Sequence, residues 1–394
     1  MTVTAAPRPL DGLVVLDFSQ IVAGPLAAMV LGDLGARVIK IEPPSGDAAR
    51  QLGSRAAEGY QGMFESFNRG KESIVLDLRT SQDREQALTL VENADVLIES
   101  SRVGVMDRLG LGVEAVRQRN PGLIYVSINA FGETGPNADR GGVDVVVQAE
   151  TGWMSITGEP DGPPTKLGSI PIDAATGHVA AQGALAALFA RTRTGRGDVV
   201  RVSLYDVACS LHTHDFTDYL SRGWVAKRSG NYPAATTPSG VYATADGSIV
   251  LAAYMPHHWQ SAVEILDDDR LRSDPRFATM KDRIRHRDEL LSILKEVLRR
   301  RTTAEWSEAF ESARITSGVV RDTGEVAESD QFAAAGLAVE LTGRDGEPVR
   351  TIRSPARYGS FGWRPATAAP ALDANRAAVD RDFGRDLPAA APAR

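Results

Sequence analysis

The chain has 394 residues, 43% of them apolar, which excludes a disordered or fibrous protein and leaves room for two domains with a sizeable core. Its net charge of −7 excludes a general attraction to nucleic acid or to an anionic membrane. The single cysteine, Cys209, excludes an intrachain disulfide and favours a reducing compartment. We find no signal sequence and no apolar segment of about twenty residues, so the predicted location is the cytoplasm.

The first half of the chain alternates strand and helix patterns. Helical stretches are predicted near 25–34, 82–92 and 112–119. Apolar, branched runs predict strands at GLVVLDF (12–18), ARVIKIE (36–42), SIVLDL (73–78), DVLIES (95–100) and LIYVSIN (123–129). This alternation predicts an α/β fold with a Rossmann-like parallel sheet covered by helices, and ligands usually bind at the carboxyl edge of such a sheet.

A second, smaller region begins near residue 230. SGVYATADGSIVLAA predicts two strands joined through Asp246-Gly247, and charged amphipathic helices are predicted near 286–300 and 303–312. This pattern is typical of a small α+β domain.

Strand character returns at 337–352, around a second predicted turn at Asp345-Gly346. We therefore expect a large Rossmann-like domain interrupted by a small α+β domain with its linkers. The predicted bounds are 1–225 plus 330–394 for the large domain and 226–329 for the small domain.

Several common chemistries lack their signatures. Glu42 ends the second strand as a ribose-binding acid would, but the loop SQIVAGP lacks the G-x-G-x-x-G pyrophosphate cradle, which argues against a classical NAD site. No histidine is spaced with cysteines or acids as in a metal site, and G-x-S-x-G is absent. Basic residues of the first domain could together neutralise several phosphates, although each alone is more often a solvated side chain: Arg69, Lys71, Arg79, Arg102 and Arg108.

Asp173 stands in GSIPIDAATG, at the start of a strongly helical run that continues as HVAAQGALAALFART. Taken alone, the position favours an N-cap, whose carboxylate accepts a backbone N–H two or three residues on. The Glu or Gln of a capping box is missing, because residue 176 is Thr. A functional role for Asp173 is the alternative.

A series of motifs, in the same order along nearly the whole chain, resembles the class III coenzyme A transferases, the CaiB/BaiF family. The motifs are PLDGLVVLDFSQIVAGPLAAMVLGDLGARVIKIE, NRGKESIVLDL, DVLIES with MDRLGLG, NPGLIYVSINAFGETGP, TGEPDGPPTKLG, IDAATG, TGRGDVVRVSLYD and, in the small domain, DPRFATMKDRIRHRDELL. The resemblance implies a homodimer whose two chains interlock as linked rings. It also implies acyl-CoA and a small carboxylic acid as substrates, with no tightly bound cofactor and no metal.

In this family the acid in the position of Asp173 is the nucleophile. The resemblance implies that its carboxylate attacks a thioester carbonyl, that a mixed anhydride and then an aspartyl-CoA thioester form, and that an incoming carboxylic acid leaves as the new acyl-CoA. Succinyl-CoA is one expected donor, and small dicarboxylic acids are the first expected acceptors.

The family's coenzyme A contacts carry over to seven positions. The chain departs from many relatives at Ser100-Ser101, where they have Asn-Phe, and at Pro43, where some have a basic residue. The implied coenzyme A-binding residues are Val22, Ala23, Leu76, Arg79, Ser100, Ser101 and Arg108.

Two other functions compete with transfer. A 2-methylacyl-CoA racemase of the same fold needs an acid/base pair around one carbon, and relatives of that kind carry a histidine before an aspartate as GHD. Here Val143 holds the histidine position before Asp144, and His178 is expected to face away from Asp173. A coenzyme A-binding protein without turnover is disfavoured because IDAATG is intact.

Overall fold

The computed structural model divides the chain into two compact units. It describes residues 7–53, 62–233, 235–343, 346–362 and 367–383. Residues 152–166 group with the small unit, whereas the sequence-based bounds place them in the large domain. The large unit comprises Met1–Thr151, Leu167–Ser221 and Ala334–Arg394, and the small unit comprises Gly152–Lys166 and Arg222–Ala333.

The large unit is built on a six-stranded sheet in the order β3-β2-β1-β4-β5-β6, and every neighbouring pair is parallel. The five strands predicted from apolar runs are present, and residues 199–203 add the sixth. The strands are β1 (Val14–Asp17), β2 (Arg37–Glu42), β3 (Glu72–Val75), β4 (Val96–Glu99), β5 (Ile124–Asn129) and β6 (Val199–Ser203).

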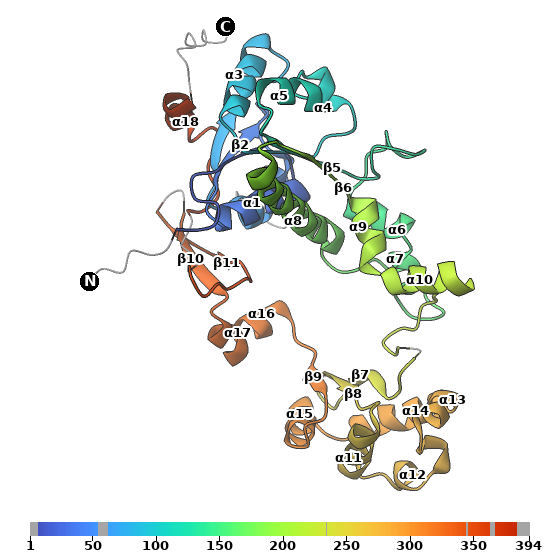
Figure 1. Cartoon of the computed structure of the whole chain (residues 1–394). Coiled ribbons are helices and arrows are strands. Elements are labelled where there is room, and N and C mark those ends of the chain that lie inside the picture. Colours follow the sequence, from blue (N-terminus) through green and yellow to red (C-terminus); the bar gives the residue numbers. More distant parts are fainter. Residues whose placement is uncertain (1–6, 54–61, 234, 344–345, 363–366, 384–394) are drawn as a thin grey trace. The chain divides into compact units, whose positions relative to one another are not determined.

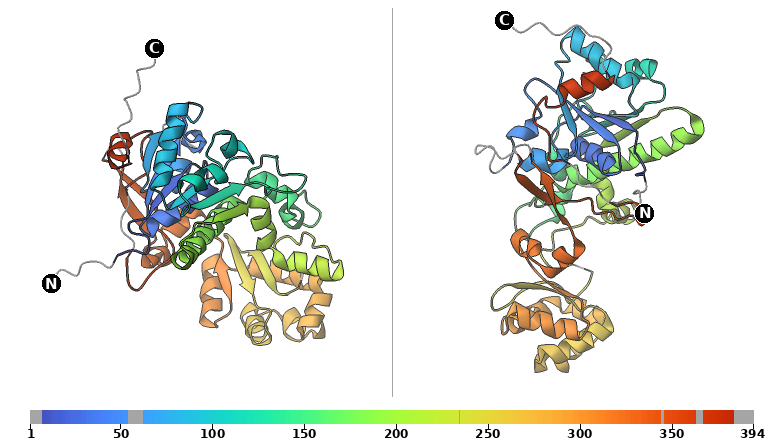
Figure 2. Two further views of the ribbon diagram at one scale, coloured as in Figure 1. Left: turned by 45° about the horizontal axis from the view of Figure 1, so that its top comes forward. Right: turned by 90° about the vertical axis from the view of Figure 1, so that its left-hand side faces the viewer.

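Helices cover both faces of this sheet because successive strand residues point to opposite faces. Leu16 and Leu97 pack with α3 (Ser81–Glu92) and α5 (Val113–Arg119) in one core cluster. On the other face, α1 (Ala23–Asp33) and α8 (Pro171–Thr194) pack against each other (Figure 1; Figure 2). Their contact is close, because a Cβ on Gly177 of α8 would lie 2.7 Å from the carbonyl oxygen of Ala23.

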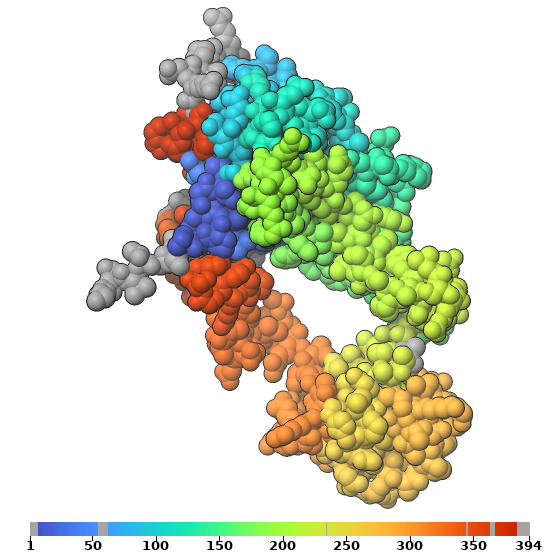
Figure 3. Space-filling model, in the orientation of Figure 1, coloured from blue at the N-terminus to red at the C-terminus, as the bar shows by residue number. Residues whose placement is uncertain are grey.

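Shorter helices complete the large unit. One of them, α10, lies at the surface of the large unit (Figure 3). It buries none of its residues and exposes Tyr219 and Leu220, at 54% and 79%. These elements are η1 (Ala48–Gln51), α2 (Gly62–Asn68), α4 (Val105–Arg108), α6 (Asp144–Glu150), α9 (Leu204–Leu211) and α10 (Thr213–Arg222). Helix α17 (Asp330–Ala335) contains the boundary between the small unit and the last segment of the large unit.

The C-terminal part of the chain returns to the large unit. The predicted strand region forms an antiparallel hairpin of β10 (Ala338–Thr342) and β11 (Pro348–Ile352), while Asp345 of its predicted turn lies outside the described residues. Ahead of α18 (Arg376–Phe383), two side chains bind the free edge of β3. Asn375 accepts the N–H of Ser73 at 3.0 Å, and Asp373 accepts the N–H of Val75 at 2.7 Å.

The small unit contains the predicted two-stranded hairpin, extended to a three-stranded antiparallel sheet. Its core packs Tyr242 and Leu251 of the sheet against Trp259, Phe277 and Trp306. Its elements are α7 (Trp153–Ile156), β7 (Ser239–Ala243), β8 (Ser248–Ala252), α11 (Pro256–Leu266), α12 (Asp269–Arg272), η3 (Pro275–Phe277), α13 (Met280–Arg285), α14 (Arg287–Leu298), α15 (Thr303–Ser312), β9 (Ser317–Val319) and α16 (Thr323–Ala327).

Candidate active site

Two loops meet where the strand order of the sheet reverses, between β1 and β4. In open α/β sheets, ligands bind outside the carboxyl ends of the strands at this reversal. The loop after β1 covers residues 18–22, and Ser100 begins the loop after β4. The backbone N–H of Gln20 donates to Ser100 Oγ at 3.0 Å. Ser100 therefore joins the two loops.

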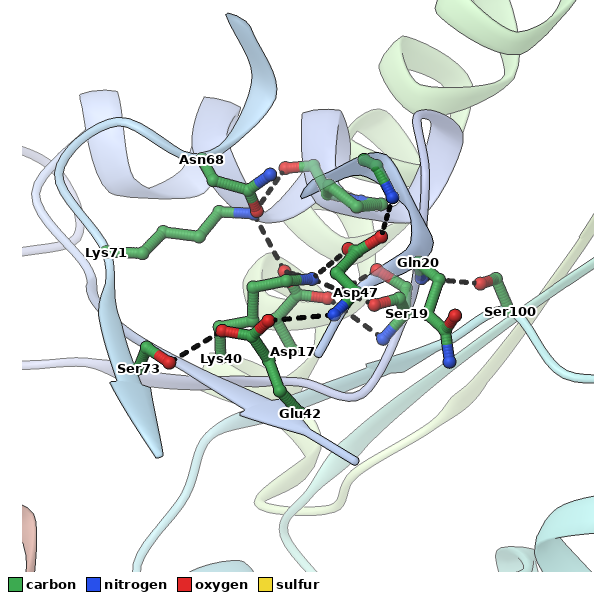
Figure 4. Close-up of polar contacts among 12 residues, drawn as sticks. Asp17, Ser19, Gln20, Lys40, Glu42, Asp47, Asn68, Lys71, Ser73 and Ser100 are labelled. Carbon is green, nitrogen blue, oxygen red and sulfur yellow. Dashed lines mark hydrogen bonds and ion pairs between the residues drawn. The ribbon is translucent and has the colours of Figure 1, made fainter. Parts of the chain in front are cut away.

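Buried charges hold the loop after β1 in place (Figure 4). The Lys40 ammonium donates to the Ser19 carbonyl oxygen at 2.9 Å and pairs with Asp47 at 2.8 Å, and Lys71 pairs with Asp17 at 2.7 Å. Burial acts to raise the pKa of Asp17, but the positive charges of Lys40 and Lys71 outweigh it and lower the pKa to about 2. Asp17 is therefore ionised at neutral pH and anchors both lysines.

The idea that five basic residues together neutralise phosphates is wrong for two of them. Arg69 is 4% exposed and pairs with Asp33 at 2.5 Å, and Lys71 is 3% exposed within the network around Asp17. A buried and paired cation has no free charge to offer a ligand. Three of the five remain exposed: Arg79, Arg102 and Arg108.

The loop after β1 carries a strained residue immediately before the predicted coenzyme A contacts Val22 and Ala23. Ile21 has φ 70°, in the left-handed region that a β-branched residue rarely adopts. Its N–H donates to Asp47 Oδ1 at 3.1 Å, which helps to hold this conformation. Val22 is the N-cap of α1 and provides no side-chain cap, and the side chains of Val22 and Ala23 are buried.

Glu42, compared above with a ribose-binding acid, is occupied by protein partners. Arg50 binds both of its oxygens, at 2.7 and 2.8 Å, and Ser73 Oγ donates to Oε1 at 2.6 Å. The carboxylate therefore holds η1 and β3 together.

A pocket of about 560 Å³ lies over the carboxyl ends of β2, β3 and β4. It brings together three predicted coenzyme A-binding residues, Leu76, Arg79 and Ser101. Arg79 binds Asp77 at 2.7 Å and its side chain is 81% exposed. Arg108 lies exposed on α4 beside lining residues of this pocket, although it does not line the pocket itself. The other lining residues are Phe18, Gln20, Ile41, Glu42, Pro43, Pro44, Ser45, Asp77, Leu78, Val105, Met106 and Leu109.

A second pocket of about 470 Å³ adjoins the first at Ser101. Ser100 and Ser101 form part of its wall, and Val143, the residue before α6, forms another part. The N–H of Ser101 donates to the buried Glu99 at 2.7 Å, which fixes the turn out of β4. The remaining wall residues are Arg102, Val103, Asn129, Ala130, Ala138, Arg140, Gly141, Gly142 and Val146.

The interpretation of Asp173 as an N-cap is wrong. Helix α8 begins at Pro171, its N-cap is Ile170, and no side chain of the N-cap binds the helix. Asp173 is the third helical residue, and its own N–H donates to Asp144 Oδ2 at 3.1 Å. A carboxylate from α6 thus takes the capping role that the sequence pattern assigned to Asp173.

Asp173 is half-buried, and burial together with the nearby charge of Asp144 raises its pKa to about 7. Perturbed acids of this kind cluster at functional sites. His178 lies exposed further along α8.

The packing of α1 against α8 places Asp173 near the predicted coenzyme A loop. Helix α1 follows β1, and helix α8 precedes β6 of the same parallel sheet. Both helices therefore begin at the carboxyl edge of the sheet. Gly177 meets Ala23, the first residue of α1, and Asp173 lies about one helical turn before Gly177. The fold therefore brings Asp173, Val22 and Ala23 to one edge.

Two pairs of residues at this edge were not predicted as site residues. Lys40 and Asp47 shape the loop after β1, and Asp144, held by Gln148, binds the start of α8. Asp144 precedes an apolar run, which is a helix-start signal. Nothing in the sequence indicates that it binds a helix 28 residues further on.

Among the described residues, no three His, Cys, Asp or Glu side chains gather closely enough to hold a metal ion. The described helices include none with the length and apolar character needed to span a bilayer.

Comparison with known proteins identifies the family. The model of CoA-transferase family III matches residues 10–376. The probable fatty acyl-CoA transferase Rv3272 of Mycobacterium tuberculosis is 41% identical over 90% of this chain and 93% of that protein. The acetyl-CoA:oxalate CoA-transferase of Acetobacter aceti is 37% identical over 97% and 98%. The crystal structure of a CaiB/BaiF family protein from Brucella suis matches with a TM-score of 0.88 and 33% identity over 96% of this chain and 100% of that chain.

The fold and these relatives define a CoA-transferase, and the chain belongs to CoA-transferase family III. It is an acyl-CoA:carboxylate CoA-transferase. Coenzyme A thioesters and carboxylic acids are accordingly its substrates.

Proposed function

We propose that the enzyme moves coenzyme A from a donor such as succinyl-CoA to a small dicarboxylic acid, with Asp173 as the nucleophile. The Asp173 carboxylate attacks the donor thioester carbonyl and forms a mixed anhydride as the CoA thiolate leaves. The thiolate attacks the aspartyl carbonyl, which releases the donor acid and leaves an aspartyl-CoA thioester. The acceptor carboxylate then attacks this thioester, and the released thiolate attacks the acceptor carbonyl of the new anhydride. Acyl-CoA departs and the Asp173 carboxylate is regenerated.

The observation that carries this proposal is the half-buried Asp173 in the first turn of α8 with its pKa raised to about 7. Because Asp144 binds the start of α8, the Asp173 carboxylate is not needed as a cap. A carboxylate with a raised pKa is also more basic than an ordinary one, which favours attack once it is ionised. Transfer should therefore fall as the pH drops below about 7, where Asp173 takes up a proton.

The seven predicted coenzyme A-binding residues receive proposed roles from their places at the sheet edge. The 560 Å³ pocket, with Leu76, Arg79 and Ser101, would hold the nucleotide end of coenzyme A. The exposed cations Arg79 and Arg108 would face its phosphates. Ser100, Val22 and Ala23 would lie along the path from this pocket toward Asp173.

The choice of substrates is supported by the names of relatives. The Acetobacter aceti protein is named for oxalate as acceptor, and further curated relatives are named for succinyl-CoA as donor. The experiment is a panel of acids, including oxalate, succinate, glutarate and a long-chain fatty acid, offered with succinyl-CoA or acetyl-CoA. We expect new acyl-CoA with at least one dicarboxylic acid, measured by liquid chromatography. Transfer to the fatty acid alone would contradict the proposed acceptor class.

Racemisation is not expected, because the Val143 side chain has no acidic or basic group that could transfer a proton. His178 is exposed further along α8 rather than beside Asp173. Incubation with (2R)-2-methylacyl-CoA in deuterium oxide, without an acceptor acid, should leave the hydrogen at C2 in place. Nuclear magnetic resonance or mass spectrometry measures the exchange. Rapid deuterium incorporation would favour a racemase over a transferase.

The enzyme is proposed to act as an interlocked homodimer in the cytoplasm. Helix α10 supports association because it buries no residue and exposes Tyr219 and Leu220. Light scattering should give the mass of two 42.1 kDa chains, unchanged on dilution. A mass that falls toward one chain on dilution would contradict interlocking.

A further inference from the structure

The start of α8 is completed by a residue of another helix. Pro171 has no N–H, and the N–H of Ala174 already donates to the Ile170 carbonyl oxygen at 3.1 Å. The two remaining donors of the first turn, the N–H groups of Ile172 and Asp173, both donate to Asp144 Oδ2, at 2.7 and 3.1 Å. One carboxylate oxygen therefore satisfies every free donor of this turn.

Asp144 is itself held in one orientation. It is 5% exposed, and its second oxygen accepts the Gln148 amide N–H at 2.5 Å. The Gln148 amide cannot turn over, because its oxygen accepts the N–H of Leu167 at 2.8 Å. Both oxygens of Asp144 must therefore accept hydrogen bonds, which a carboxylate can do and an amide cannot.

We propose that Asp144 is a positioning residue for CoA transfer: by binding the first turn of α8 it fixes the direction in which Asp173 meets the thioester. The inference rests on the proposed role of Asp173 as nucleophile. A displacement of about 1 Å at a reacting group can cost roughly 100-fold in rate, so a loosened first turn would be felt in kcat.

Asp144 also acts on Asp173 through its charge. Other charged residues on the elements packed against α8 are paired elsewhere, Asp33 with Arg69, Glu150 with Arg140 and Arg201 with Glu133, or exposed, as are Asp206 on α9 and His178 on α8 itself. After burial, Asp144 is the group that raises the pKa of Asp173. Loss of its charge should therefore shift the acid limb of the rate profile to lower pH.

The experiment compares two variants of the full-length enzyme, Asp144→Asn and the double variant Asp144→Asn/Gln148→Glu. In the single variant the NH2 of the new amide must face another donor, either the NH2 of Gln148 or the backbone N–H groups in the first turn of α8. In the double variant the residue 148 carboxylate accepts from both Leu167 N–H and the new amide, so the residue 144 oxygen is free to accept from α8. Every hydrogen bond is restored, and the charge has moved one helical turn away.

We expect Asp144→Asn to lower kcat roughly 100-fold and the double variant to recover it to within roughly fivefold of the wild type. Both variants should show an acid limb below the wild-type value of about 7. A single variant with unchanged kcat, or a folded double variant as slow as the single one, would overturn the positioning role. If the single variant does not fold, recovery of transfer in the double variant still supports the proposal.

Trapping distinguishes this inference from the proposed function. If the wild type forms no adduct on Asp173 with succinyl-CoA, the nucleophile assignment itself fails. If the wild type forms the adduct and Asp144→Asn forms it at the same rate, only the positioning role fails.

Discussion

Replacing Asp173 with alanine is expected to lower CoA transfer by roughly 10⁴-fold or more, because the covalent carrier of both intermediates is lost. The wild type, incubated with succinyl-CoA, should carry an adduct on Asp173 that intact-mass analysis detects and hydroxylamine locates. The variant should carry none.

The same variant should fold normally, because Asp144 and not Asp173 caps α8. Asp173 has its pKa raised from an ordinary value of 3.8 to about 7, so the folded state holds a proton that the unfolded chain has released between these values. Its contribution to stability therefore falls as the pH rises from about 4 to 7. The unfolding temperature of Asp173→Ala minus that of the wild type should therefore be more positive at pH 8 than at pH 4.

Asp206→Ala is the matched control. Asp206 is likewise the third residue of its helix, α9, but it is exposed, and Ser203 caps that helix. Near-normal transfer by Asp173→Ala, or a loss of equal size in Asp206→Ala, would remove the basis of the mechanism.

Replacing Lys40 with methionine is expected to destabilise the large unit by about 3–5 kcal/mol, because Asp47 loses its ion pair and Asp17 loses one of two partners inside the protein. Differential scanning calorimetry should show the unfolding temperature lowered by roughly 6–20 °C. The KM for acyl-CoA should rise as well, because Lys40 holds the carbonyl of Ser19 in the loop after β1.

Arg119→Met is the control for this change. Arg119 also pairs with two acids, Glu85 and Glu92, but its side chain is 39% exposed, and such pairs contribute about 1 kcal/mol or less. Equal shifts in the two variants would show that the buried network contributes no more than a surface ion pair.

Much of the fold could be predicted from local sequence. The short apolar runs ARVIKIE and LIYVSIN form β2 and β5, as predicted. The helices predicted near 82–92 and 112–119 are α3 and α5. These signals depend on neighbours in the sequence. The strand at 199–203 was missed among the predicted elements, because its VVRVS run is short and directly continues into α9.

The site could be predicted only where its residues carry a local pattern. The motif singled out Asp173 as a candidate, but the residue was wrongly assigned a capping role because the actual cap, Asp144, lies in another helix. Lys71 was grouped with basic residues that could together neutralise phosphates, because its charge is visible in the sequence and its burial beside Asp17 is not. Such tertiary pairings separate residues by dozens of positions, and a single sequence does not record them.

The covering of the β3 edge by Asn375 and Asp373 has a consequence for biosynthesis. Ser73 and its partner Asn375 are 302 residues apart, so at ordinary translation rates roughly 15–60 s pass between the synthesis of the two. During that interval β3, at the end of the sheet, presents unpaired N–H groups to any other strand nearby. Until Asp373 and Asn375 have been made, this edge of the sheet is open to wrong association with strands of other chains on the ribosome.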